Sequence, residues 1–315
     1  MRSRPGSSAP SAPRVGAVGE ERSRVEVGDS HLATVGRLQV RRALPRHGRR
    51  SVGAWCFADH LGPLAVTAAS GLDIGPHPHC GLQTVTWLSA GEALHRDSLG
   101  TEQLIRPGEL NLMTAGHGVA HAEEATGQYD GLLEGIQLWI ALPEGTREGP
   151  AAFEHRASLP QVDLGAGTAT VLVGALGGVA SPARHDTPLV GADVQVRGPV
   201  EVALDPAFEH AVIVMGGALD VDATRVAEGQ VAYLAPGRGA LALASRSARA
   251  ILLGGPPLAA PPLMWWNFVA RTREEMDAAY ASWRAPDGRF GEVASLLARV
   301  DAPAPYWRRA GAARA

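Results

Sequence analysis

Short apolar stretches separated by glycine or proline dominate the chain from about residue 32 onward. Three examples are TVTWLSAGE (84–92), LNLMTAGHG (110–118) and IQLWIALPEG (136–145). The 38 glycines and 23 prolines among 315 residues interrupt the chain before long helices can form. Strand-length runs bounded by such turns are typical of an antiparallel sandwich or barrel, so we expect an all-β fold.

The strand pattern occurs twice. WLSAGEALHRD and RPGELNLMTAG in the first half share a loose plan with VMGGALDVD and AEGQVAYLAPG in the second. This predicts two tandem barrels, over 26–150 and 151–315. Residues 1–25, rich in Ser, Pro, Gly and Arg, are expected to form a disordered tail. The apolar spacing in 271–283 predicts a terminal amphipathic helix, and SLLARV (295–300) is a candidate for a second one.

Charge and composition argue against several function classes. All 29 basic residues are arginine, the net charge is −3 and no basic stripe stands out, so we expect no direct nucleic-acid contact. No apolar run reaches the roughly 18 residues of a membrane helix, so no membrane association is expected. Cys56 and Cys80 are the only cysteines, too few for a disulfide framework, which indicates a cytoplasmic protein. Two barrels can bury each other's faces, so a monomer is the default expectation.

Two histidine-containing motifs lie about forty residues apart. GPHPHCGLQTVTW (75–87) places His77 and His79 at i, i+2 spacing, and HGVAHAEE (117–124) repeats that spacing with His121 and Glu123. Side chains at i and i+2 of a strand point to the same face. The first pair alone is more often two unrelated histidines near a turn. Together the pairs predict three imidazoles and a carboxylate around one divalent metal ion, with open coordination positions left for chemistry.

The chain resembles the pirin family through these motifs. GLDIGPHPHCGLQTVTWLSAG (71–91) looks like the first cupin motif and RPGELNLMTAGHGVAHAEE (106–124) like the second. GIQLWIALP (135–143) and ILLGGPPL (251–258) add to the resemblance, which covers about residues 30–285. It implies a bicupin: two tandem cupin-type antiparallel β-barrels, here with a C-terminal α-helix.

The resemblance also implies the ligand set. Iron in pirins is held by three His and one Glu, which carries over to His77, His79, His121 and Glu123. Where pirins commonly have a further Glu that does not bind the metal, this chain has Gln83. Fe(II) is the expected ion, although the same ligands would accept Mn, Co, Ni, Cu or Zn.

The pirin resemblance leaves two functions open. One is an Fe(II)-dependent oxygenase similar to quercetin 2,3-dioxygenase, acting with O2 on a flavonol or a similar hydroxy-keto aromatic. In that case Glu123 is the expected catalytic base, since it can accept the substrate hydroxyl proton beside the metal. The alternative is a non-catalytic iron-binding regulator of a transcription factor or metabolic enzyme. Because both functions use the same ligands, the motifs do not separate them; we favour the enzyme.

Other candidate residues are given structural roles. His95 and His117 are expected at the surface or in ordinary hydrogen bonds, and Asp97 in turn capping, although each could support a ligand. Glu124 should face away from the site, and MWWNFVAR (264–271) should pack rather than stack on a substrate.

The second half lacks the paired spacing. His185 and His210 stand alone there, so we expect the second barrel to carry no metal.

Overall fold

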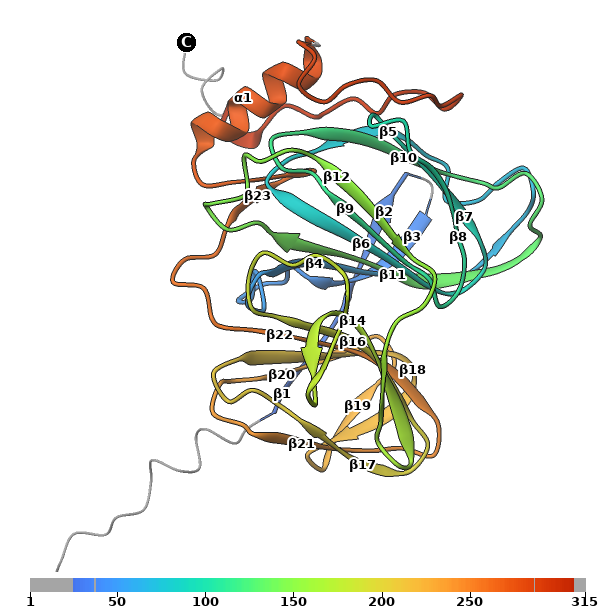
Figure 1. The fold of residues 1–315 in the computed structure, drawn as a ribbon, viewed down its shortest axis with the longest axis vertical. Helices are drawn as coiled ribbons and strands as arrows, with labels where there is room; N and C mark the ends of the chain where they lie inside the picture. The colour runs from blue at the N-terminus through green and yellow to red at the C-terminus, as the bar shows by residue number, and fades with distance from the viewer. Residues whose placement is uncertain (1–24, 37, 286, 309–315) are drawn as a thin grey trace, which may run out of the picture.

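The computed structural model of the chain describes residues 25–36, 38–285 and 287–308. The predicted tail, 1–25, therefore lies outside the described residues except for Val25, which is buried. Two β-barrels are stacked one above the other, and a single long helix lies at the outer end of the first (Figure 1). The all-β expectation is confirmed, because α1 is the only helix of more than one turn among the described residues.

A seven-stranded and a four-stranded sheet form the first barrel and enclose an apolar cluster that includes Leu38, Leu88 and Ile105. The seven-stranded sheet has the order β12 (Ala152–Arg156), β9 (Leu110–Thr114), β6 (Leu82–Ala90), β11 (Gly131–Ala141), β4 (Trp55–Val66), β3 (Leu38–Leu44) and β2 (His31–Val35). The four-stranded sheet has the order β5 (Ile74–His79), β10 (Val119–Glu124), β7 (Ala93–Asp97) and β8 (Glu102–Ile105).

The second barrel is one eleven-stranded sheet that curls around an interior of Val, Leu and Ala side chains. Its main path runs through β1 (Glu26–Asp29), β20 (Gln230–Leu234), β18 (Glu209–Val221), β22 (Ala248–Gly255), β16 (Val190–Val196), β14 (Gly167–Leu176) and β13 (Gln161–Asp163). The remaining strands are β15 (Val179–Ala180), β17 (Pro199–Ala203), β19 (Thr224–Ala227) and β21 (Ala240–Ala244).

At both ends of the domain predicted at 26–150, a strand pairs with the barrel on the other side of the predicted boundary. The strand β1 pairs with β20 of the second barrel, with Glu26 opposite Tyr233. The strand β12 pairs with β9 of the first barrel, with Phe153 opposite Met113. Both are edge strands, and the sheet edge that such a strand completes depends on tertiary arrangement rather than on local sequence.

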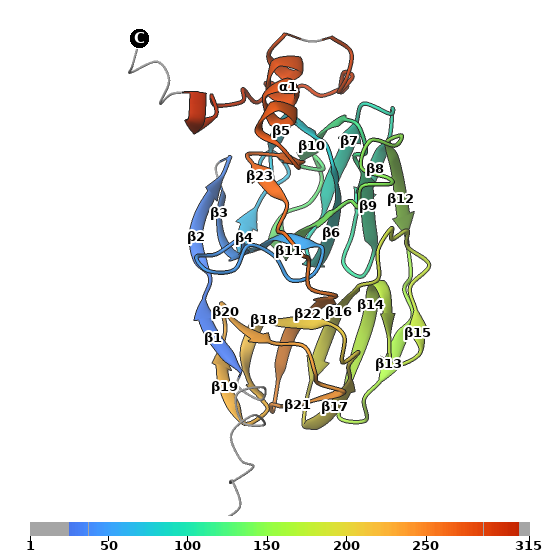
Figure 2. The ribbon, with the colours of Figure 1, turned by 90° about the vertical axis from the view of Figure 1, so that its left-hand side faces the viewer.

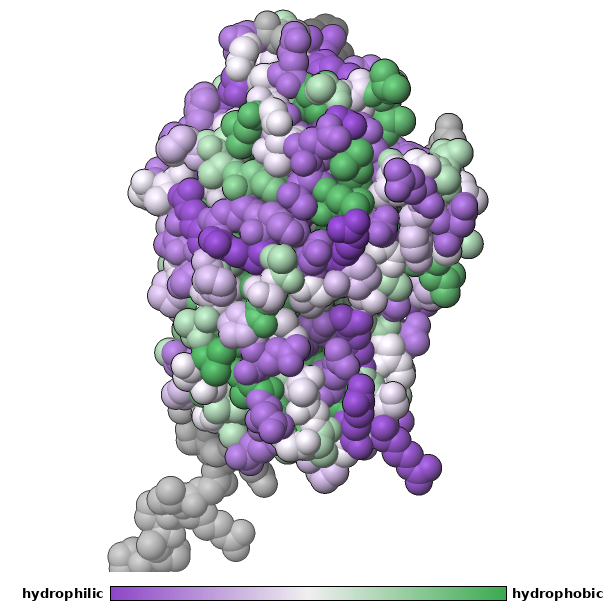
Figure 3. Space-filling view, turned by 45° about the vertical axis from the view of Figure 1, so that its right-hand side comes forward, coloured by the Kyte–Doolittle hydropathy of each residue, from purple (hydrophilic) through white to green (hydrophobic). Residues whose placement is uncertain are grey.

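The two barrels share one apolar interface, which contains buried side chains from β4, β6 and β11 on one side and from β14, β18 and β22 on the other. The fully buried Trp55 donates its indole N–H toward the carbonyls of Val190 (3.0 Å) and Gly254 (3.2 Å) across this interface. Trp87 likewise donates to the Asp193 carboxylate at 2.9 Å. On the face shown in Figure 3, hydrophobic patches are scattered among more polar surface.

The chain leaves the second barrel and returns to the outer end of the first, where it forms β23 (Leu263–Trp265), β24 (Phe268–Ala270) and α1 (Arg273–Arg284) (Figure 2). The helix predicted at 271–283 is thus confirmed, and the Thr272 side chain caps it by accepting the Glu275 N–H. None of the described residues forms a helix long and apolar enough to cross a membrane.

The second predicted helix, over 295–300, is wrong. These residues run without helical structure, and the Val300 N–H donates to the Pro76 carbonyl at 2.9 Å. Six residues are too few to offset the cost of nucleating a helix without supporting contacts. The segment instead covers β5, where a Cβ added at Gly75 would lie 2.0 Å from the Ala298 carbonyl oxygen.

Candidate metal centre

The two histidine motifs form adjacent strands, β5 and β10, of the four-stranded sheet. The strands are antiparallel, with His121 opposite His77 and Val119 opposite His79. Strand alternation turns these histidines into the barrel, whereas Cys80 and Ala120 face the C-terminal segment. The spacing seen in the sequence therefore brings the three imidazoles to one place.

The ligand atoms of His77, His79 and His121 all lie within 4.8 Å of one another. The Nε2 atoms of His79 and His121 are 3.1 Å apart. Two nitrogens bound at right angles to one ion, each at about 2.0–2.1 Å, would be separated by about 3 Å. The arrangement therefore fits a single first-row divalent metal ion without rearrangement of these two rings.

Backbone carbonyls orient two of the rings. The Nδ1 of His77 lies 2.9 Å from the Gly75 carbonyl oxygen, and the Nδ1 of His79 lies 3.0 Å from that of Asn267. A carbonyl only accepts, so Nδ1 must carry the proton and Nε2 keeps its lone pair for a metal. Asn267 lies in the turn between β23 and β24, so the C-terminal segment helps to build the site.

Burial keeps the three imidazoles neutral. It lowers the pKa of His77 to about 4, despite the hydrogen bond to the Gly75 carbonyl. Burial, and after it the neighbouring imidazoles, hold the pKa values of His79 and His121 well below the ordinary value. Neutral imidazole is the form that binds a metal ion, so the ligands need not lose protons near neutral pH.

Glu123 lies near this cluster but is not part of it. It follows His121 by two residues in β10, is only 4% exposed, and accepts a hydrogen bond from the Thr86 hydroxyl at 3.3 Å. The same hydroxyl is 2.9 Å from the amide oxygen of Gln137. Burial raises the pKa of Glu123, although the nearby His95 and the Thr86 hydrogen bond oppose that shift.

A fourth histidine completes the polar interior: of the two roles expected for His95, it has the hydrogen-bonding one and lies inside the barrel rather than at the surface. His95 is 3% exposed, and its Nδ1 lies 3.4 Å from the Nδ1 of His121. Its Nε2 lies 3.1 Å from the carboxylate of Asp97, which also caps a turn as predicted. The only sequence signal was the i, i+2 spacing of His95 and Asp97, the same spacing that marked the metal motifs.

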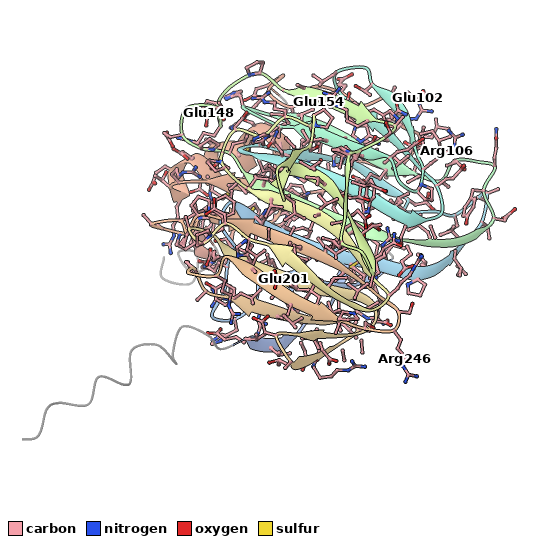
Figure 4. All side chains as sticks on the ribbon, turned by 60° about the horizontal axis from the view of Figure 1, so that its bottom comes forward. Glu102, Arg106, Glu148, Glu154, Glu201 and Arg246 are labelled. Atoms are coloured by element: carbon pink, nitrogen blue, oxygen red, sulfur yellow. The ribbon has the colours of Figure 1, made fainter. Side chains whose placement is uncertain are left out.

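The remaining candidates lie away from the centre. His117 is exposed and pairs at 2.8 Å with Glu148, which Figure 4 shows at the periphery of the molecule. Glu124 faces outward toward Arg96. Gln83 is buried and donates to the Thr114 hydroxyl at 3.0 Å, so it serves packing between β6 and β9.

Aromatic side chains form a wall beside the histidines. The ring of Trp139 meets that of His79 edge to face at 5.0 Å and stacks on Phe57 at 4.0 Å. The predicted packing role of 264–271 also holds: Trp265 and Phe268 pack with α1, and Met264 packs on the cluster that contains Trp139.

Comparison with known proteins agrees with this geometry. The family model described as Pirin matches residues 37–140, and the one described as Pirin C-terminal cupin domain matches 191–291. A Pseudomonas aeruginosa protein named "Putative quercetin 2,3-dioxygenase" is 45% identical over 277 residues, covering 87% of this chain and 88% of that protein. A Caulobacter vibrioides pirin-like protein is 35% identical, covering 85% and 97%.

A solved structure gives the same result at the level of the fold. The crystal structure of a quercetin 2,3-dioxygenase from Acinetobacter baumannii superimposes with a TM-score of 0.86 at 40% identity, covering 89% of this chain and 95% of that one. The matches extend over both barrels and confirm two cupin-type domains, and on this evidence the chain belongs to the pirin family.

Proposed function

We propose that the protein is a metal-dependent dioxygenase of the quercetin 2,3-dioxygenase type. The observation that carries the proposal is the convergence of the Nε2 atoms of His77, His79 and His121 inside the barrel. Together with Glu123 as the proposed fourth ligand, they leave about two positions open on a six-coordinate ion, as a catalytic rather than a structural site requires. Fe(II) is the ion we expect. Relatives whose names include this activity support the choice of reaction.

The residues around the triad suit a flat hydroxy-keto aromatic substrate. Trp139 and Phe57 offer an apolar wall next to His79, and apolar walls bind and orient aromatic rings. A divalent metal ion, when bound, supplies Lewis-acid stabilisation of charge on a substrate oxygen and redox contact with O2.

Glu123 is the proposed proton acceptor. A flavonol hydroxyl has to lose its proton before ring cleavage, and a carboxylate within hydrogen-bond reach performs that step. Glu123 is also the proposed fourth ligand, so its role is split between metal ligand and proton acceptor; it is buried and accepts from the Thr86 hydroxyl. Glu123→Gln should therefore keep some metal and lose most turnover. Unchanged turnover would reject the base role.

Oxygen consumption with quercetin tests the whole proposal. Protein loaded anaerobically with Fe(II) should consume O2 in step with loss of the flavonol absorbance, and His121→Ala should do neither. The matched control is His117→Ala, which removes a histidine from the same motif but from the exposed side of it. Absence of uptake by fully metallated protein would overturn the enzyme and favour the alternative, an iron-binding regulator with a protein partner.

A further inference from the structure

We infer that Asp97 and His95 form a hydrogen-bonded relay that fixes the tautomer of His121 and directs its Nε2 lone pair to the metal. The inference rests on the metal site of the proposed function and assigns a positioning role to two residues outside the metal-binding cluster. His121 needs such support because, among the described residues, no backbone carbonyl serves it in the way that Gly75 and Asn267 serve the other two rings.

The relay begins at a carboxylate held in its anionic form. Asp97 accepts the backbone N–H groups of Leu99 at 2.9 Å and Thr101 at 3.0 Å through Oδ1, which leaves Oδ2 for His95. Two backbone N–H donors on one oxygen favour the anionic form of the carboxylate. An ionised carboxylate only accepts hydrogen bonds. The Nε2 of His95, 3.1 Å away, must therefore carry a proton.

The second step follows from the two nitrogens of a neutral imidazole. If Nε2 of His95 is the donor, its Nδ1 is an acceptor. That Nδ1 faces Nδ1 of His121 at 3.4 Å, so the His121 nitrogen must donate and carry the proton. The Nε2 of His121 is then the lone-pair nitrogen, and it is the atom that lies 3.1 Å from Nε2 of His79.

Packing holds the relay in place. The His95 ring stacks on Phe153 of β12, with ring centres 4.5 Å apart and planes at 25°. The β7–β10 pairing sets Asp97 opposite His121 and His95 opposite Glu123. With Asp97, His95 and His121 all 3% exposed or less, water does not compete for these hydrogen bonds.

Metal affinity of the full chain tests the relay without any substrate. Apo protein is titrated with Co(II) against a competing chelator, and the affinity is read from the visible absorption of the bound ion. Asp97→Asn and His95→Leu should bind Co(II) about 10–100-fold more weakly, as is typical when a group that orients a ligand is lost. His95→Gln should recover most of the affinity, because its amide oxygen can accept from His121. His117→Ala is the control and should match the unsubstituted protein.

Nuclear magnetic resonance of the unsubstituted chain tests the tautomers directly, so the result does not depend on whether a variant folds. Long-range ¹H–¹⁵N spectra of the apo and Zn(II)-loaded protein should place the protons on Nε2 of His95 and Nδ1 of His121. A proton on Nδ1 of His95, or unchanged Co(II) affinity in folded Asp97→Asn, would overturn the relay. Lack of quercetin turnover alone would overturn the proposed reaction and leave these readouts intact.

Discussion

Replacing Phe268 with alanine should weaken metal binding although this side chain faces away from the metal-binding cluster. Phe268 is fully buried beneath α1, and its ring packs on that of Phe290 with centres 5.6 Å apart. Its neighbours in the chain contact the metal-bearing strand: the Asn267 carbonyl accepts from His79, and the Val269 N–H donates to the Cys80 carbonyl at 3.1 Å.

The magnitude follows from the burial. Removing a fully buried phenylalanine ring costs about 3–5 kcal/mol, and here the loss falls on the segment that carries Asn267. If that segment opens more often, His79 loses the carbonyl that fixes its tautomer. We therefore expect Co(II) affinity to fall by about 10–100-fold, the range typical of a lost partner to a metal-binding histidine.

Two measurements on the same variant separate stability from ligand orientation. Hydrogen exchange at the Val269 amide reports opening of the hairpin, and chelator competition reports metal affinity. Phe208→Ala, which trims a partly buried ring in the second barrel, is the control and should change neither. Faster exchange at Val269 with unchanged Co(II) affinity would refute the view that the Asn267 carbonyl orients His79.

Three further predictions concern stability. Trp55→Phe should cost about 2–4 kcal/mol in urea unfolding, because it removes the indole N–H that bonds two carbonyls of the second barrel and shrinks a buried ring. A change below the error of the fit would contradict this. Burial lowers the pKa of His210 to about 4, so the unfolded chain binds a proton that the folded chain does not as pH falls from about 6.5 to 4. The free energy of unfolding should fall as pH is lowered through that window, by up to about 3 kcal/mol from this group. The fall should be smaller in His210→Leu. Equal slopes of unfolding free energy against pH in the two proteins would argue against a contribution from His210. Gly81→Ala should destabilise the fold by about 1–3 kcal/mol, since φ is +71° and the added Cβ would lie 2.1 Å from the Val269 carbonyl oxygen; an unchanged thermal unfolding midpoint would show that the turn adapts.

Local patterns predicted which side chains converge because strand alternation is a local property. In β5 and β10 the i, i+2 spacing alone decides that His77 and His79, and likewise His121 and Glu123, share a face. The same rule, applied to His95 and Asp97, would have placed both inside the barrel. What the sequence did not reveal was that β7 pairs with β10, since register between strands depends on tertiary packing.

Long-range contacts set the limit of such predictions. His79 takes its orienting carbonyl from Asn267, 188 residues away, and no local pattern marks a backbone carbonyl as a partner. The first described strand, β1, completes the second barrel rather than the first for the same reason. The run over 295–300 has helical spacing, yet it is used to cover β5, where tertiary contact overrides propensity.

The two barrels share an architecture, but the first buries more polar side chains than the second. The second barrel is filled with Val, Leu and Ala, whose burial stabilises it directly. The first barrel buries His77, His79, His121, Glu123 and Asp59 beside its own apolar cluster, and buried polar groups cost free energy unless they are fully hydrogen-bonded. Its sheets are therefore supported from outside: the seven-stranded sheet by the apolar interface with the second barrel, and the four-stranded sheet by the returning C-terminal segment. It follows that the first barrel should not keep the histidine geometry when separated from the residues after 160, because both supports come from that part of the chain.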